Sequence, residues 1–119
     1  MVYSSQYIDH FTRPRGIGEL DPHDGLGEVQ HEGQGCFDRV RLTIRLEGGK
    51  VKEAKFRARA CSGTIAACSA LVEMIRDRDL AFVKNLTPDD IAEYLGGIPD
   101  RKRHSVELAV RALREALLD

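Results

Sequence analysis

Alternation of apolar and charged residues marks the middle of the chain as a β-hairpin. In the stretch RVRLTIRL, which starts at Arg39, apolar side chains occupy every second position. The phrase EGGK then predicts a turn, and VKEAKFRARA predicts a returning strand. A break in the alternation between Val51 and Ala54 predicts a β-bulge near Lys52. The predicted inward positions of the two strands are Val40, Leu42, Ile44, Leu46, Phe56, Ala58 and Ala60.

The residues before the hairpin carry a weaker pattern. One of the serines at positions 4 and 5 suits the N-cap of a short helix with Ile8 and Phe11 on one face. Residues 16–35 are rich in glycine, aspartate and proline. We interpret them as a loop that contains one short strand at residues 28–31.

Helical spacing replaces alternation after Cys61. Apolar residues recur every three or four positions in SGTIAACSALVEMIRDRDL, which predicts a buried helical face that includes Cys68. The phrase TPDDIAEYLGG places a helix start at Thr87 and a stop at Gly96. A last helix is predicted from about Ser105, with an apolar stripe made of Val106, Ala109, Val110, Leu113, Ala116 and Leu117.

The order of these elements predicts an α+β fold. A small antiparallel sheet of about three strands, followed by several helices, is expected to carry the helices on one face. A length of 119 residues is typical of one core, so we expect a single domain over residues 1–119.

Composition indicates which classes of ligand and which cellular compartment to expect for the chain. The 18 lysines and arginines nearly balance the 19 acidic residues, so no net charge draws the chain to nucleic acid or anionic lipid. No apolar run reaches the roughly 18 residues of a membrane span, and the first residues lack the pattern of a secretory signal. The three cysteines suit a reducing compartment, so we expect a cytoplasmic protein that binds neither membranes nor nucleic acid.

Polar residues with metal-binding chemistry gather at one end of the predicted hairpin. Cys36 and Asp38 lie at the entrance of its first strand, and Cys61 follows the exit of its second. Antiparallel pairing brings these positions together, and His104 lies where the last helix begins. Helix N-termini favour thiolate and neutral imidazole. Two thiolates, one imidazole and one carboxylate are four candidate ligands for zinc or for iron held through sulfur.

Four longer segments carry a resemblance to a known family. They are YSSQYIDHFTRPRGIGEL, GQGCFDRVRLTIRL, ARACSGTIAACSAL and LGGIPDRKRHSVELAVRALREAL, and they span nearly the whole chain. Together they resemble the IscU/NifU-type iron–sulfur cluster assembly scaffolds, whose domain is the NifU-like N-terminal domain. The resemblance implies a protein that is not an enzyme, takes sulfur from a cysteine desulfurase and passes a transient cluster to recipient apoproteins.

The resemblance also assigns site residues one by one. Cys36 and Cys61 match the first two cysteines of the family, Asp38 matches its aspartate, and His104 matches the histidine beside the third cysteine. These residues are therefore expected to hold a transient [2Fe–2S] cluster or iron, with zinc as the alternative occupant. The third cysteine is replaced by Ser105, whose protonated hydroxyl is a poor ligand for a soft metal.

Other departures from the family limit the expected partners. The segment IPDRK keeps only Pro99 and Lys102 of a double-proline motif, so we do not expect dependence on a dedicated chaperone. We expect a monomer or a weak homodimer. Ser105 itself is interpreted as the N-cap of the last helix, and Cys68 as a core residue.

Three functions remain open at this point. The first is a cluster scaffold or carrier, favoured by the retained Asp38, and the second is a zinc-bound structural or regulatory protein, favoured by the missing third cysteine. The third is a nucleic-acid module, which the absence of interleaved aromatic residues disfavours. It would use the basic outer face of the hairpin, formed by Arg41, Arg45, Lys55, Arg57 and Arg59.

Simpler interpretations apply to the remaining polar residues. His10, His23 and His31 are expected on the surface rather than among metal ligands. The basic run at residues 101–103 lies next to the candidate site and offers a docking point for an acidic partner protein.

Overall fold

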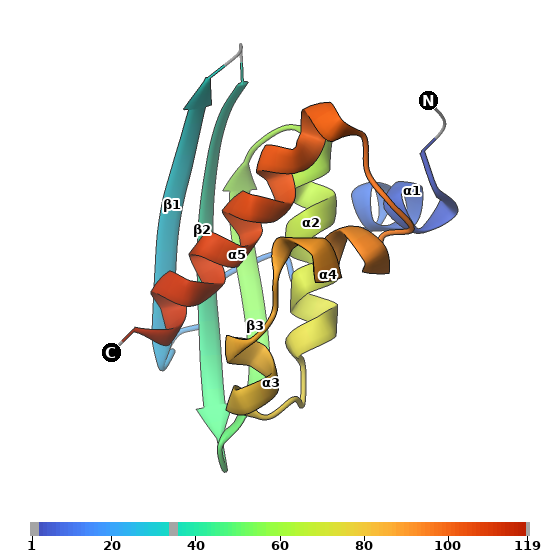
Figure 1. The fold of residues 1–119 in the computed structure, drawn as a ribbon. Helices are drawn as coiled ribbons and strands as arrows, with labels where there is room; N and C mark the ends of the chain where they lie inside the picture. The colour runs from blue at the N-terminus through green and yellow to red at the C-terminus, as the bar shows by residue number, and fades with distance from the viewer. Residues whose placement is uncertain (1–2, 34–35, 119) are drawn as a thin grey trace.

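A three-stranded antiparallel sheet with helices on one side forms the fold (Figure 1). The computed structural model describes residues 3–33 and 36–118, and the side chains of residues 32–37 lie outside that description. The elements in chain order are α1 (Ser5–Thr12), β1 (Gly25–Gly33), β2 (Cys36–Glu47), β3 (Lys50–Arg59), α2 (Ser62–Ile75), α3 (Leu80–Lys84), α4 (Pro88–Tyr94), a 3₁₀ turn η1 (Asp100–Lys102) and α5 (Arg103–Leu117).

The central hairpin follows the predicted pattern. Strands β2 and β3 pair antiparallel from Arg39 opposite Arg59 to Glu47 opposite Lys50. The pairing register shifts by one residue after Arg45, which leaves Lys52 without an opposite partner. The predicted β-bulge is therefore confirmed, and it keeps both Val51 and Phe56 in the core despite the broken alternation.

Strand β1 is longer than the predicted strand at residues 28–31 and occupies nearly half of the segment interpreted as loop. It runs from Gly25 to Gly33 and pairs with β2 along its whole length. Its inward positions include two glycines because α5 lies very close. A Cβ atom on Gly27 would lie 2.0 Å from the carbonyl oxygen of Ala112, and one on Gly25 would lie 2.0 Å from that of Ala116. Glycine at these positions hides the apolar alternation of the strand.

The helices form the second layer of the molecule. Helices α2 and α5 lie side by side over the same face of the sheet, with α1 and α4 at their outer side (Figure 1). The α+β prediction is confirmed. The largest fully buried side chains between the layers are Leu42, Ile44, Phe56, Leu71, Ile75, Ile91, Leu95, Leu108 and Leu113.

Helix α1 buries a different face from the one predicted. Tyr7 and His10 are buried, whereas Ile8 and Phe11 are 49% and 42% exposed. The interpretation of His10 as a surface histidine is wrong, because its Nδ1 lies 2.7 Å from the Ser69 hydroxyl of α2. Burial lowers the pKa of His10, so this buried imidazole is held in its neutral form.

Helix boundaries agree with the capping signals where those signals are strong. Thr87 and Asp90 form the capping box of α4, as the sequence predicted. Helix α2 ends at Ile75, before the end of the stretch with helical spacing, and Asp77 has a left-handed backbone (φ 62°) between α2 and α3. Helix α5 begins at Arg103, so Ser105 lies inside the helix and the prediction that it is the N-cap is wrong.

The second face of the sheet is covered only in part. Leu20, in the segment before β1, lies over Thr43 and its backbone N–H donates to the Thr43 hydroxyl at 3.0 Å. Both residues are buried, whereas Arg39 and Arg59 on the same face are exposed.

Over residues 3–33 and 36–118, none of the helices is long and apolar enough to cross a bilayer.

The glycine contact between β1 and α5 predicts a large effect of a single methyl group. Gly27→Ala should lower the free energy of unfolding by about 1–3 kcal/mol, because the added Cβ forces strand and helix apart. Chemical denaturation measures this change. Gln30→Ala, on the exposed side of the same strand, is the matched control and should change stability little. Equal stability of the two variants would contradict the observed packing.

Candidate metal centre

Three elements deliver one polar side chain each to the same end of the sheet. Asp38 is near the start of β2, Cys61 lies between β3 and α2, and His104 is the second residue of α5. In Figure 1 this is the end where β3 passes into α2 and where α5 begins. Asp38 and Cys61, which hairpin pairing predicts to converge, lie together in the fold, and the candidate ligand His104 lies beside them.

The three side chains are spaced like ligands of one metal ion. The Cys61 Sγ lies 3.8 Å from His104 Nε2 and 3.7 Å from Asp38 Oδ2, and the last two atoms are 3.3 Å apart. Tetrahedral zinc, with bonds of about 2.3 Å to sulfur and about 2.0–2.1 Å to nitrogen or oxygen, would separate sulfur from nitrogen by about 3.6 Å and nitrogen from oxygen by about 3.4 Å. The observed spacings match these values within a few tenths of an ångström.

Asp38 is buried but well satisfied by hydrogen bonds. Its side chain is 1% exposed. Its Oδ1 accepts the backbone N–H of Cys61 at 3.0 Å, and its Oδ2 accepts the hydroxyl of Thr64 at 2.6 Å. Burial raises the pKa of Asp38. These two hydrogen bonds and the nearby His104 lower the pKa by more than burial raises it, so the net pKa is below its ordinary value. The site therefore holds a carboxylate rather than a carboxylic acid.

Cys61 occupies the N-terminal end of α2, where thiolate is favoured. It is the N-cap residue of that helix. Burial raises the pKa of its thiol, but hydrogen bonds from the backbone and hydroxyl of Thr64 and from Ser105 outweigh burial, so the net pKa is below its ordinary value. Cys68, by contrast, is fully buried, and burial raises its pKa to about 12. Of these two thiols, only Cys61 has a lowered pKa, which favours the thiolate form that binds metals.

Ser105 points into the site instead of capping a helix. It is fully buried, and its hydroxyl lies 3.8 Å from the Cys61 Sγ and 3.1 Å from the Thr64 hydroxyl. Gly63 leaves room for it, because a Cβ atom there would lie 2.7 Å from the Ser105 Oγ. The position is thus a place for a fourth side chain next to the three candidate ligands, filled here by a hydroxyl.

Sequence reasoning missed two residues of this site. Thr64 lies three positions after Cys61, a helical spacing that returns it to the same face and that is visible in the sequence. His31 stands opposite Asp38 in the β1–β2 pairing, and its ring stacks on His104 with 4.8 Å between centroids. His31 is half-buried and is not among the three grouped ligand side chains, so the expectation that it is not a metal ligand stays a prediction, but its contact with His104 was not expected. No local sequence pattern predicts this stack, because it depends on how α5 crosses β1.

Cys36 remains a prediction. It is the first residue of β2 and pairs with Gly33 of β1, two positions before Asp38 on the same strand. Its side chain lies outside the described part of the chain.

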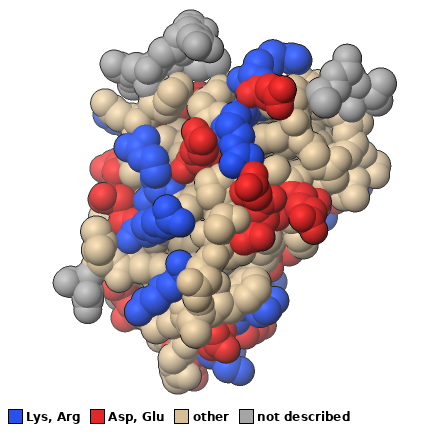
Figure 2. Space-filling view, in the orientation of Figure 1, with Lys and Arg blue, Asp and Glu red and all other residues tan. Residues whose placement is uncertain are grey.

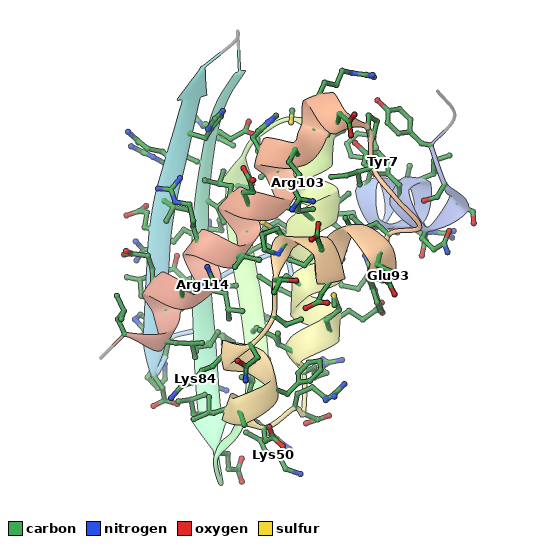
Figure 3. The ribbon with its side chains drawn as sticks, viewed as in Figure 1. Tyr7, Lys50, Lys84, Glu93, Arg103 and Arg114 are labelled. Atoms are coloured by element: carbon green, nitrogen blue, oxygen red, sulfur yellow. The ribbon has the colours of Figure 1, made fainter. Side chains whose placement is uncertain are left out.

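The basic run beside the site is already partly occupied. Arg103, between α5 and α4 in Figure 3, contacts Asp89 at 2.7 Å, and Arg101 donates to the Tyr3 hydroxyl at 2.9 Å. Around them, Figure 2 shows acidic and basic side chains interspersed over the helical face. This face therefore presents no single sign of charge, which weakens the expectation that residues 101–103 dock an acidic partner.

A search of protein families identifies the domain type. A family model described as the NifU-like N-terminal domain matches residues 2–119. The scaffold protein IscU of Azotobacter vinelandii, named for iron–sulfur cluster assembly, is 35% identical over 121 residues, covering 100% of this chain and 94% of that protein. IscU 1 of Archaeoglobus fulgidus, with the same named role, is 34% identical over 118 residues, covering 99% of this chain and 76% of that protein.

Solved structures support the same fold. A crystal structure of a candidate iron–sulfur cluster assembly scaffold protein for the SUF system, from Fervidobacterium islandicum, superposes with a TM-score of 0.73. The match covers 97% of this chain and 96% of that one at 20% identity. At this identity the likeness concerns the fold alone.

The hydrogen bonds of Thr64 predict a measurable change in Cys61 reactivity. In metal-free protein, Thr64→Val should move the pH midpoint of Cys61 alkylation upward, because the variant loses a hydroxyl that stabilises the thiolate. Peptide mass mapping separates Cys61 from the other cysteines. Thr43→Val, which removes a buried hydroxyl on the opposite face of the sheet, is the control and should leave the profile unchanged. An unchanged midpoint in Thr64→Val would contradict the assigned contacts.

Proposed function

The chain belongs to the NifU-like N-terminal domain family, and we propose that it is an iron–sulfur cluster assembly scaffold or carrier. The observation that carries this proposal is the convergence of Asp38, Cys61 and His104, whose ligand atoms all lie within 4.8 Å of one another. The names of the relatives support the same role, since both are iron–sulfur cluster assembly scaffolds.

Each candidate ligand contributes a different chemistry to the bound cargo. The thiolate of Cys61 offers the soft donor that iron–sulfur chemistry requires. The imidazole of His104 and the carboxylate of Asp38 are harder donors, which suit iron(II) and zinc. Cys36 is proposed as the second thiolate, on the basis of its place at the start of β2 and of the family resemblance. The cargo is a [2Fe–2S] cluster or iron.

Ser105 makes this a site for loosely held cargo. A serine hydroxyl stays protonated near neutral pH and is a weak ligand for iron, so at most two thiolates serve the cluster. His104 and Asp38 then complete the coordination. Bonds from imidazole and carboxylate to cluster iron exchange more readily than thiolate bonds, which favours transfer to another protein over storage.

The proposal includes partners that follow from the role. A cysteine desulfurase supplies sulfur, and recipient apoproteins take the finished cluster, without a dedicated chaperone. The chain performs no catalytic turnover of its own and works as a monomer or weak homodimer. A reducing cytoplasm suits it, because Cys61 and Cys68 are free thiols. The whole of residues 1–119 is proposed to act as one domain.

A zinc-bound member of the same fold is the second candidate function. The spacing of sulfur, nitrogen and oxygen around the site matches the ligand spacing of tetrahedral zinc. The buried Ser105 hydroxyl occupies the position of the third cysteine of the family, so the site has one thiolate fewer for a cluster. In this case the site would stabilise the fold or regulate a partner. A nucleic-acid role is disfavoured, because Arg41 and Arg45 of the basic face already pair with Glu19 and Glu53.

Removing one ligand tests the site assignment for both metals. Cys61→Ala should abolish retention of iron and zinc after gel filtration, because it removes the only described thiolate within reach of His104 and Asp38. Metal analysis of the purified chain measures the loss, and circular dichroism verifies that the helices persist. Cys68→Ala, at the fully buried cysteine, is the matched control and should retain metal. Full retention by Cys61→Ala would rule out this centre.

Restoring a thiol tests whether the pocket keeps geometry suited to a cluster. Ser105→Cys should raise the yield and lifetime of a reconstituted cluster, because the new sulfur would replace a hydroxyl oxygen that lies 3.8 Å from the Cys61 Sγ. Visible absorption and acid-labile sulfide follow the cluster over time. Ser105→Ala, which removes the hydroxyl without adding a thiol, is the control. The same yield for Ser105→Cys and Ser105→Ala would show that the pocket no longer accepts a third thiolate.

A further inference from the structure

The uncovered face of the sheet carries two pairs of arginines that face each other across β2 and β3. Arg39 stands opposite Arg59, and Arg41 stands opposite Arg57. Like charges directly opposite one another destabilise a sheet. The four arginines line a shallow hollow of about 450 Å³, together with Glu28 and Ala58. We call these four residues, Arg39, Arg41, Arg57 and Arg59, the arginine ladder.

The chain's own carboxylates show which ligand the ladder accepts. Arg41 holds Glu19 through two donors, with Nε at 2.8 Å from Oε1 and Nη2 at 3.4 Å from Oε2. Glu19 also lies 3.8 Å from Nε of Arg57. This forked arrangement is the geometry in which guanidinium recognises a carboxylate. Arg41 and Arg57, the inner half of the ladder, are thus neutralised by acidic side chains from the same chain.

Arg39 and Arg59, the outer half of the ladder, have no acidic partner among the described side chains. Both of these arginines are exposed. Arg39 directly follows Asp38, and Arg59 lies two residues before Cys61. A molecule that binds these two arginines is therefore brought beside the candidate metal centre, from the side of the sheet that the helices leave open.

The spacing of the ladder suits an extended polypeptide. Alternate residues on a strand lie about 7 Å apart, and acidic residues at alternate positions of an extended segment repeat at the same distance. None of the described residues that line the hollow is aromatic, whereas binders of single-stranded nucleic acid stack bases on aromatic rings. The chain's net charge of −1 also gives no long-range attraction to a polyanion.

We propose that the arginine ladder docks an extended acidic segment of a partner protein beside the metal centre. The surface goes beyond the scaffold role, since its binding chemistry needs neither metal nor sulfur. It accounts for the opposed pair of Arg39 and Arg59, which costs stability and has no acidic partner among the described side chains.

The test uses the full metal-free chain and a fluorescein-labelled peptide of alternating glutamate and serine. Fluorescence anisotropy should show saturable binding at about 0.01 M salt, weakened on moving to about 0.15 M as the Debye length falls from about 30 Å to about 8 Å. Arg39→Glu with Arg59→Glu should weaken binding at least tenfold. The matched control is Arg76→Glu with Arg111→Glu, two exposed arginines elsewhere on the surface, and it should bind within twofold of the parent.

A charge-neutral variant keeps the test decisive if the reversed charges impair folding. Arg39→Gln with Arg59→Gln should also lose peptide affinity, while thermal unfolding shifts upward because one opposed arginine pair is gone. Undetectable peptide binding at low salt, or equal loss in the ladder and control variants, would overturn the proposal. Equally tight binding of oligothymidylate, with the same dependence on Arg39 and Arg59, would overturn the assignment to an acidic protein segment.

Discussion

The buried carboxylate of Asp38 is the interaction on which the site depends. It accepts the backbone N–H of Cys61 and the hydroxyl of Thr64, so a single side chain of β2 fixes both the end of β3 and the first turn of α2. A buried charge without such partners would be costly, and here its hydrogen bonds lower its pKa despite burial. The carboxylate thereby orients the thiol of Cys61 and is itself a candidate metal ligand.

Close packing of α5 on the sheet supplies the rest of the centre. Two glycines of β1 let the helix approach until a single added methyl group would collide with its backbone. The helix then presents His104 to the Asp38 and Cys61 side chains and directs Ser105 into the space between them and α2. Stability and function are coupled here, because the contact that seats α5 on β1 also sets the position of two site residues.

The sequence predicts those parts of the molecule that depend on local pattern. Alternation identified the β2–β3 hairpin and the bulge at Lys52, and capping chemistry identified α4. The alternation in β1 predicts too short a strand, because two of its inward positions are glycines, which carry no hydrophobic signal. The apolar spacing in α1 predicts the wrong buried face, because the polar residue His10 is buried against Ser69.

The candidate site also has parts that the sequence predicts and parts that depend on tertiary packing. Hairpin topology alone brings Asp38 to Cys61, so this pair could be predicted, and the place of His104 at the start of the last helix made it a further candidate ligand, which the family resemblance also indicates. The stack of His31 on His104 and the inward direction of Ser105 depend on tertiary packing, for which the sequence has no local signal. Cys36 is the candidate ligand that the described side chains leave as a prediction.

Metal and sulfide analysis after anaerobic reconstitution tests the central claim most directly. The chain is purified without chelator, incubated with iron(II), cysteine, a cysteine desulfurase and a thiol reductant that converts persulfide sulfur to sulfide, and analysed for iron, zinc and acid-labile sulfide together with its visible spectrum. A scaffold should carry iron and sulfide in equal amounts and show thiolate-to-iron absorption despite Ser105. Stoichiometric zinc with no bound sulfide would contradict the scaffold role and would assign the centre to zinc.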